Sequence, residues 1–320
     1  MRSLRPFATV ALLALLALPA SAAPGKFKSR IGVHLIGRYS AGTRKMVQAR
    51  LPVLKILDLH GPLLEAARDY KKANPDGVVV LRCYNPVHWG LGDDPEQKGQ
   101  EYWDNIIWKK LGSLAEADRK LIDYVEATNE CDNCPTWGSP EDTQWFTKFS
   151  VKFAEACGKA GFKPCLASIP VGNPGGNRQE IQAKILEYAP ALRAAKKVKG
   201  AWSYHSYTCE YTTDPKVEAF YSLRYRIFYE AFKGPYKDLA EMPLIMTEGG
   251  VDRSGNKDTD GWQARGDAEK FQNWLKWYDG EIKKDKYVIG VTLFECGDPG
   301  GWKTFDVEPM ADWLADYWGK

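Results

Sequence analysis

The feature that most constrains this chain is an alternation that repeats from one end to the other. Short apolar, often β-branched runs are each followed by a charged segment with helical periodicity, and eight such runs occur. Because the runs lack regular polar alternation, they are typical of parallel strands buried on both faces. The expected strands are 31–36, 53–58, 78–83, 122–128, 164–169, 201–205, 244–247 and 289–294.

The segments between these runs carry helix signals. Residues 61–73 place apolar side chains on one face, and Ser139-Pro140-Glu141-Asp142 is a typical helix start. Strands alternating with about eight helices predict a single (β/α)8 TIM barrel. The alternative, a doubly wound open sheet, would more often carry a glycine-rich phosphate loop, which Gly32-Val33-His34 does not supply. The other expected helices are 139–159, 178–197, 217–239, 263–284 and 310–318.

The N-terminal segment is typical of a secretory signal peptide. A basic start precedes the apolar run 8–20, which is too short to cross a bilayer, and Ala20-Ser21-Ala22 matches a cleavage site. We therefore expect 1–22 to be a signal peptide and 23–320 to be one barrel domain. The mature protein would be secreted, extracellular or periplasmic, without membrane attachment; the alternative is an N-terminus that stays tethered to the membrane.

Charge and cysteine content narrow the possible partners. The 44 basic and 41 acidic residues give a net charge of +3, which offers no electrostatic basis for binding nucleic acid. Seven cysteines fit an oxidising compartment. Cys131 and Cys134 lack the second ligand pair of a zinc site, so we expect at least one disulfide involving one of them. Cys157 and Cys165 could also pair, and Cys83 is the candidate for a free buried thiol.

Chemistry in such barrels collects where strands meet the loops that follow them. Asn129-Glu130 follows the fourth expected strand and Glu248 follows the seventh. Two carboxylates placed there would face each other across the barrel mouth, as cleavage of a glycosidic bond requires. All four histidines lie at the same predicted rim: His34, His60, His88 and His205.

At these residues the chain resembles the clan-A retaining glycoside hydrolases, (β/α)8 enzymes with catalytic glutamates after strands four and seven. The segment from Val125 to Glu130 looks like the clan's strand-four ending, and that from Leu244 to Gly249 looks like its strand-seven ending. His205-Ser206-Tyr207 resembles the strand-six His-x-Tyr of several families in the clan. The resemblance spans about 30–318, and no family within the clan is assigned.

Three positions depart from the clan's pattern. Members often carry an arginine after strand two, whereas Arg82 lies on the third expected strand. Many members have tryptophan on strand eight, where this chain has Phe294, and Cys131 replaces the usual proline after Asn-Glu. Either the strand count is off by one or the arginine's role is filled differently.

The resemblance implies a role for each motif residue. Glu130 would be the acid/base and Glu248 the nucleophile. Asn129 would hydrogen-bond the sugar's 2-hydroxyl, and Tyr207 would hold Glu248 ionised through its own hydroxyl. The structural alternatives are a strand-end salt bridge for Glu130, a partner of Arg82 for Glu248, a loop-capping amide for Asn129 and a core tyrosine for Tyr207.

Other rim residues are candidates for contact with substrate. Histidines can hydrogen-bond sugar hydroxyls or serve structural roles, and loop tryptophans can stack on sugar rings or anchor the loops. The substrate-binding candidates are Asn129, His205, Tyr207, Arg82, His34, His88, Trp89, Trp137 and Trp302.

These features together predict a secreted, monomeric, retaining β-glycoside hydrolase that acts within a polysaccharide or oligosaccharide chain and needs no cofactor. One alternative is a catalytically idle barrel that binds carbohydrate, although such a protein has no need of paired acids. Another is a metal-dependent hydrolase. It is disfavoured because the sequence has no His-x-His or His-x-x-x-His pair, so we expect no metal.

Overall fold

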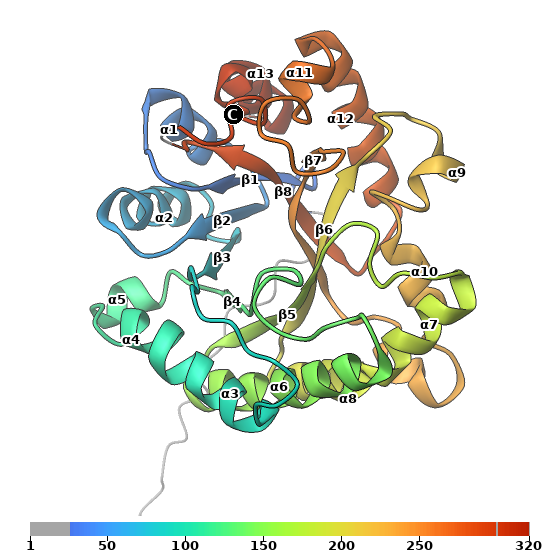
Figure 1. Cartoon of the computed structure of the whole chain (residues 1–320). Helices are drawn as coiled ribbons and strands as arrows, with labels where there is room; N and C mark the ends of the chain where they lie inside the picture. The colour runs from blue at the N-terminus through green and yellow to red at the C-terminus, as the bar shows by residue number, and fades with distance from the viewer. Residues whose placement is uncertain (1–25, 299, 320) are drawn as a thin grey trace, which may run out of the picture.

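The computed structural model describes residues 26–298 and 300–319, so the expected signal peptide, 1–22, lies outside the described residues. Eight parallel strands pair in chain order and close into a barrel through β1 and β8 (Figure 1). This confirms the predicted (β/α)8 barrel, and the closure excludes the open sheet. The strands are β1 (Ile31–Leu35), β2 (Val53–Leu57), β3 (Val78–Arg82), β4 (Tyr124–Glu126), β5 (Lys163–Ile169), β6 (Ala201–Thr208), β7 (Leu244–Val251) and β8 (Val288–Cys296).

Helices surround the barrel and cover its outer face (Figure 1). The longer ones are α2 (Gly61–Ala73), α6 (Pro140–Lys159), α7 (Arg178–Glu187), α8 (Ala189–Lys197), α12 (Ala268–Ile282) and α13 (Ala311–Trp318). The shorter helices are α1 (Ala41–Val47), α3 (Pro95–Glu101), α4 (Lys109–Leu111), α5 (Glu116–Arg119), α9 (Pro215–Glu218), α10 (Tyr225–Glu230) and α11 (Trp262–Arg265). A π-helix, η1 (Tyr102–Trp108), and two 3-10 helices, η2 (Gly234–Leu239) and η3 (Glu308–Met310), complete the elements.

Three of the long predicted helices are divided in the structure. The segment 178–197 breaks at Tyr188, because Pro190 lacks the N–H that would continue the ladder of α7. The segment 263–284 restarts after Gly266, where the Asp267 side chain accepts from the Lys270 N–H and caps α12. The segment 217–239 divides into the end of α9, then α10 and η2. Between β3 and β4, the helices α3 to α5 and η1 occupy a region to which the sequence pattern assigned none.

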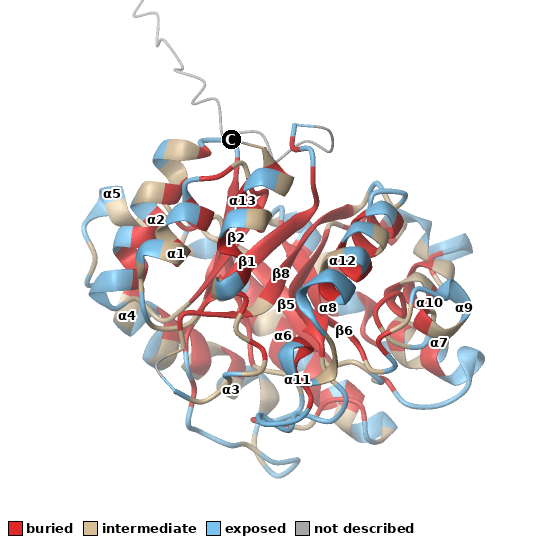
Figure 2. Cartoon of the chain, turned by 90° about the horizontal axis from the view of Figure 1, so that it is seen from above, coloured by how far each residue is buried: buried red, intermediate tan, exposed pale blue. Residues whose placement is uncertain are grey.

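The barrel interior changes from apolar to charged along its axis. Successive inward positions of β2 run from Val53 to Lys55, and those of β4 from Tyr124 to Glu126. In Figure 2 the strands at the centre are buried and the outer faces of the helices are exposed. The apolar floor comprises Val53, Val78, Val80, Tyr124, Cys165, Ala201, Ile245 and Ile289. Charged side chains lie directly above this floor.

The predicted disulfide is not formed in this structure. All seven cysteines lie within the described part of the chain and each has a free thiol. Cys131 is exposed, whereas Cys134 is buried. Cys83 is buried and unpaired, as predicted. Among the described residues no helix is long and apolar enough to cross a membrane.

Candidate active site

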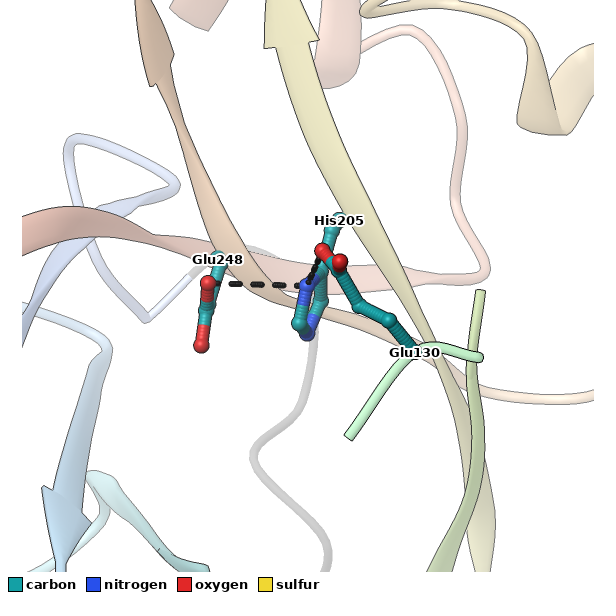
Figure 3. Close-up of side chains that lie close together, drawn as sticks. All are labelled: Glu130, His205 and Glu248. Carbon is teal, nitrogen blue, oxygen red and sulfur yellow. Dashed lines mark hydrogen bonds and ion pairs between the residues drawn. The ribbon is translucent and has the colours of Figure 1, made fainter. Parts of the chain in front are cut away.

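Two glutamates meet at the carboxyl ends of the strands with a histidine between them. Glu248 lies in β7 and His205 in β6, whereas Glu130 lies in the loop after β4, where its φ of 47° is left-handed (Figure 3). His205 Nδ1 lies 2.6 Å from Glu130 Oε1 and 3.5 Å from Glu248 Oε2. One ligand atom from each of the three residues lies within 4.8 Å of the other two. The structure therefore brings together the two carboxylates that the sequence places at this rim.

Glu248 is buried and surrounded by donors. Its Oε1 accepts from Lys55 Nζ at 3.0 Å and from Arg82 Nη1 at 3.2 Å, and its Oε2 accepts from the Tyr207 hydroxyl at 2.8 Å. Burial alone raises the pKa of Glu248, but the charges of His205, Lys55 and their neighbours outweigh it and hold the pKa well below its usual value. Glu248 is therefore ionised at neutral pH, as a carboxylate nucleophile must be.

Glu130 has different surroundings. Its side chain is 31% exposed, and its Oε1 contacts His205 Nδ1. A carboxyl group in contact with solvent and with an imidazole can exchange protons with both. This asymmetry between the two glutamates, one buried among cations and one open to water, matches the difference between a nucleophile and an acid/base.

His205 is buried between three carboxylates. Burial lowers the pKa of its imidazole, but Glu248, Glu126 and Glu130 outweigh this effect and raise the pKa to about 9. Its Nε2 lies 2.9 Å from the Ser168 hydroxyl oxygen. A charged imidazolium at this position favours the ionised forms of Glu248 and Glu126.

Three residues of the site were missed by the sequence analysis. Lys55 on β2 and Glu126 on β4 are fully buried, and Lys55 Nζ lies 2.7 Å from Glu126 Oε2. Ser168 on β5 donates to Glu126 Oε1 at 3.2 Å. A lysine and a glutamate at inward positions of otherwise apolar strands were a usable signal, because charged residues are rarely fully buried unless they are paired.

The position of Arg82 is settled by the strand pairing. Arg82 lies on β3, so the strand count is correct, and β2 contributes Lys55 instead of an arginine. Both cations contact the same oxygen of Glu248. Two neighbouring strands thus each supply a cation to Glu248.

His34, on β1, lies beside Glu248 without bonding to it. Its Nδ1 is 3.6 Å from Glu248 Oε1, and neither ring nitrogen has a hydrogen-bond partner among the described residues. Burial and the charge of Lys55 hold the pKa of His34 well below its usual value, so the ring is neutral. Its ring centroid lies 5.7 Å from that of Phe294, which packs edge-on against Trp302 at 5.1 Å.

Asn129 and His88 belong to the rim and bond to a common loop residue. Asn129 Nδ2 donates to Asp132 Oδ2 at 2.7 Å, and His88 Nδ1 lies 2.7 Å from the Asp132 carbonyl oxygen. The described hydrogen bonds of both side chains are therefore to the loop after β4 and not to the two glutamates.

The three predicted tryptophans lie in different surroundings. Trp137 is 2% exposed and packs against Phe146 and Tyr188, so its ring faces are closed to a sugar. Trp89 is partly buried against Tyr102 and Phe149. Trp302 is the tryptophan connected to the site, through Phe294, whose ring also meets Tyr207 at 6.3 Å.

Glu130, His205 and Glu248 also have a spacing that could hold a metal ion. However, Lys55 and Arg82 already bond to Glu248 and bring positive charge to the same oxygen. A cation bound there would be repelled by both side chains. The donors fit an ionised carboxylate held in place for reaction better than they fit a metal ligand.

No known family's sequence profile matches this chain, and no curated protein matches it. Solved structures do match. An endo-β-1,4-glucanase from Xanthomonas axonopodis pv. citri has a TM-score of 0.52 at 14% identity, covering 90% of this chain and 98% of its own. The mannohexaose complex of the Thermomonospora fusca β-mannanase has a TM-score of 0.50 at 12% identity, covering 87% and 82%.

A β-D-glucuronidase from Dictyoglomus thermophilum has a TM-score of 0.53 at 12% identity, covering 92% of this chain and 51% of that longer chain. At identities this low the likeness shows the shared fold. The substrates of these proteins therefore belong to those proteins, and the chemistry of this chain depends on its own residues.

Proposed function

We propose that this protein is a retaining β-glycoside hydrolase. One observation carries the proposal: Glu130 and Glu248 lie at the barrel mouth with one oxygen of each within 4.8 Å of the other, on either side of His205. Retaining enzymes have carboxyl groups about 5–5.5 Å apart, whereas inverting enzymes need about 6.5–9.5 Å to admit a water. The spacing supports retention.

The surroundings of the two glutamates assign their steps. Glu248, held ionised by Lys55, Arg82 and Tyr207, attacks the anomeric carbon and forms a glycosyl-enzyme ester. Glu130 protonates the departing oxygen. It then removes a proton from the water that cleaves the ester, because a group that acted as acid in the first step is left as a base for the second.

We further propose a polysaccharide substrate attacked within the chain. Two of the structural neighbours are named as an endoglucanase and as a mannanase bound to mannohexaose, which supports this class. Trp302, beside Phe294 at the site, offers an aromatic surface of the kind that sugars stack on. The basic and apolar N-terminal segment supports secretion, and we expect the mature protein to be monomeric.

The test is a reducing-end assay of the mature protein on a panel of β-linked polysaccharides, with product anomers followed by NMR. The proposal expects cleavage of at least one polymer, early release of the β-anomer and full activity in EDTA. Early release of the α-anomer would contradict retention. Loss of activity after exhaustive chelation would favour a metal-dependent hydrolase, and binding without cleavage would favour a carbohydrate-binding barrel.

A further inference from the structure

A buried ion pair lies beneath the two catalytic candidates, inside the barrel. Lys55 Nζ is 2.7 Å from Glu126 Oε2, and both side chains are fully buried. Such a pair is weak evidence for stability, because well-packed apolar residues in its place are often as stable or more stable. Because the Lys55–Glu126 pair lies under the two catalytic candidates, we looked to the site, and not to the stability of the barrel, for its role.

The pair is connected to both catalytic candidates. On one side, Lys55 donates to Glu248 Oε1 at 3.0 Å. On the other, Glu126 Oε1 accepts from Ser168 at 3.2 Å, and Ser168 Oγ lies 2.9 Å from His205 Nε2. His205 Nδ1 then contacts Glu130. A chain of polar contacts therefore runs from Glu248 to Glu130 through the barrel interior.

The direction of the hydrogen bonds in this chain follows from its acceptors. An ionised Glu126 can only accept, so Ser168 gives it its single hydroxyl proton. The Ser168 oxygen must then accept from His205, which places a proton on Nε2. Nδ1 is left facing Glu130, so this nitrogen and the Glu130 carboxyl share the proton that the acid step needs.

We propose that Glu126, acting through Ser168 and Lys55, is a positioning residue that fixes the protonation of His205 and the charge balance at Glu248. Without its charge, Lys55 would pair with Glu248 alone, and His205 would lose one of its anions. The effect on rate rests on the proposed function, whereas the effect on His205 does not. The groups that face His205 are Glu126, Glu130, Glu248, Tyr207 and Ser168.

The test is NMR of the imidazole nitrogens, which reports both the protonated nitrogen and the pKa of each histidine without any substrate. The chain has 4 histidines, so a His205→Asn variant assigns the signals of His205. In the wild type we expect Nε2 to keep its proton when the ring of His205 becomes neutral at pH above its pKa. Since Glu126 Oε1 lies 3.8 Å from His205 Nε2, Glu126→Gln should lower the pKa of His205 by about one unit or more.

A matched control is available in Glu218→Gln. Glu218 is another buried glutamate that accepts from hydroxyl groups, those of Ser222 and Thr208, and it has no described contact with the site. Its variant removes the same charge at a similar structural cost and should leave the pKa of His205 unchanged. The basic limb of kcat/KM should move to lower pH in Glu126→Gln and stay in place in Glu218→Gln.

A second variant keeps the proposal open to refutation if Glu126→Gln does not fold. Ser168→Ala removes the hydroxyl that connects Glu126 to His205. Above the pKa of His205, where the ring is neutral and carries one proton, that proton should redistribute from Nε2 to Nδ1. An unchanged His205 pKa in folded Glu126→Gln, or an unchanged preference for Nε2 in Ser168→Ala, would overturn the proposal. Inactivity of the wild type on every glycoside would overturn only the proposed function, because the NMR measurements need no substrate.

Discussion

At the scale of single residues, the two glutamates differ through their neighbours and not through their chemistry. Glu248 is buried and contacts two cations and a tyrosine, while Glu130 is partly open to solvent and contacts one histidine. The same carboxyl group can thus be an anion at one position and a proton carrier a few ångströms away. Substitution of the neighbours should therefore change the reaction in separable ways.

The first residue-scale prediction concerns His205 and pH. Its folded-state pKa of about 9 exceeds its ordinary value of 6.5, so its charge stabilises the fold below about pH 6.5, and this contribution is lost as pH rises through about 9. The difference in unfolding free energy between wild type and His205→Gln should shrink by up to about 3 kcal/mol from pH 6 to pH 10. Chemical denaturation at several pH values measures it, and a difference that grows with pH would contradict the assignment.

The second concerns Tyr207, whose hydroxyl donates to Glu248 Oε2. A hydrogen bond to a charged group contributes about 1.5–3 kcal/mol, so Tyr207→Phe should lower kcat/KM about tenfold to a hundredfold. Tyr188→Phe is the control, since that buried hydroxyl bonds only to Ser150 in the described hydrogen bonds. Equal rates for the two variants would show that Tyr207 packs without acting on the nucleophile.

At the scale of elements, sequence periodicity predicted which strands and helices exist better than it predicted where each of them ends. All eight apolar runs are strands, because barrel strands are buried on both faces and their pattern is strong. Some segments predicted as one helix are two helices in the structure. Single residues such as Pro190 or Gly266 interrupt the helix, although the helical pattern of the sequence continues on both sides. The paired acids at the strand ends were predictable because the strong apolar pattern of each strand also shows where the strand stops.

The remainder of the site was harder to predict because it lies within strands. Lys55 and Glu126 interrupt apolar runs, and their partners come from strands distant in sequence. The orientation of Trp137 depends on side-chain packing against α6, which no loop pattern reveals. The register between neighbouring strands is what brings such residues together, and only the folded barrel specifies it.

An element-scale prediction compares two glycines. A Cβ at Gly32 of β1 would lie 1.9 Å from the Val53 carbonyl oxygen, so Gly32→Ala must separate β1 from β2 and destabilise the barrel strongly. A Cβ at Gly280, exposed in α12, would meet nothing within 4 Å, so Gly280→Ala should stabilise by up to about 1 kcal/mol. Thermal unfolding distinguishes them, and a tolerated Gly32→Ala would contradict the close approach.

At the scale of the whole molecule, the barrel collects side chains from strands that are far apart in the sequence. Lys55, Arg82, Glu130, His205 and Glu248 come from β2, β3, the loop after β4, β6 and β7. Because β1 closes on β8, these strand ends form one ring and their side chains converge on one point. The rate of the complete reaction therefore depends on side chains from several strands of the barrel, and not on any single contact.

The final prediction separates the two steps of that reaction. Glu248→Ala lacks the group that forms the ester and should lose turnover whatever the leaving group. Glu130→Ala should lose at least about 10²–10⁴-fold on polysaccharide, where the leaving oxygen needs a proton. It should still form the glycosyl-enzyme from an activated aryl glycoside, since that leaving group departs unprotonated. The measurement compares both variants on both substrates, with and without azide.

Azide gives the decisive contrast because it is a small anion that attacks without a general base. In Glu130→Ala it should restore turnover of the aryl glycoside and give a β-glycosyl azide, the product of two inversions. In Glu248→Ala any rescue should give the α-azide, since a single displacement inverts the anomeric carbon. Glu218→Gln, outside the site, should show neither effect. If the two variants gave the opposite azides, the acid/base would be Glu248 and the nucleophile Glu130. The cations around Glu248 would then need another explanation.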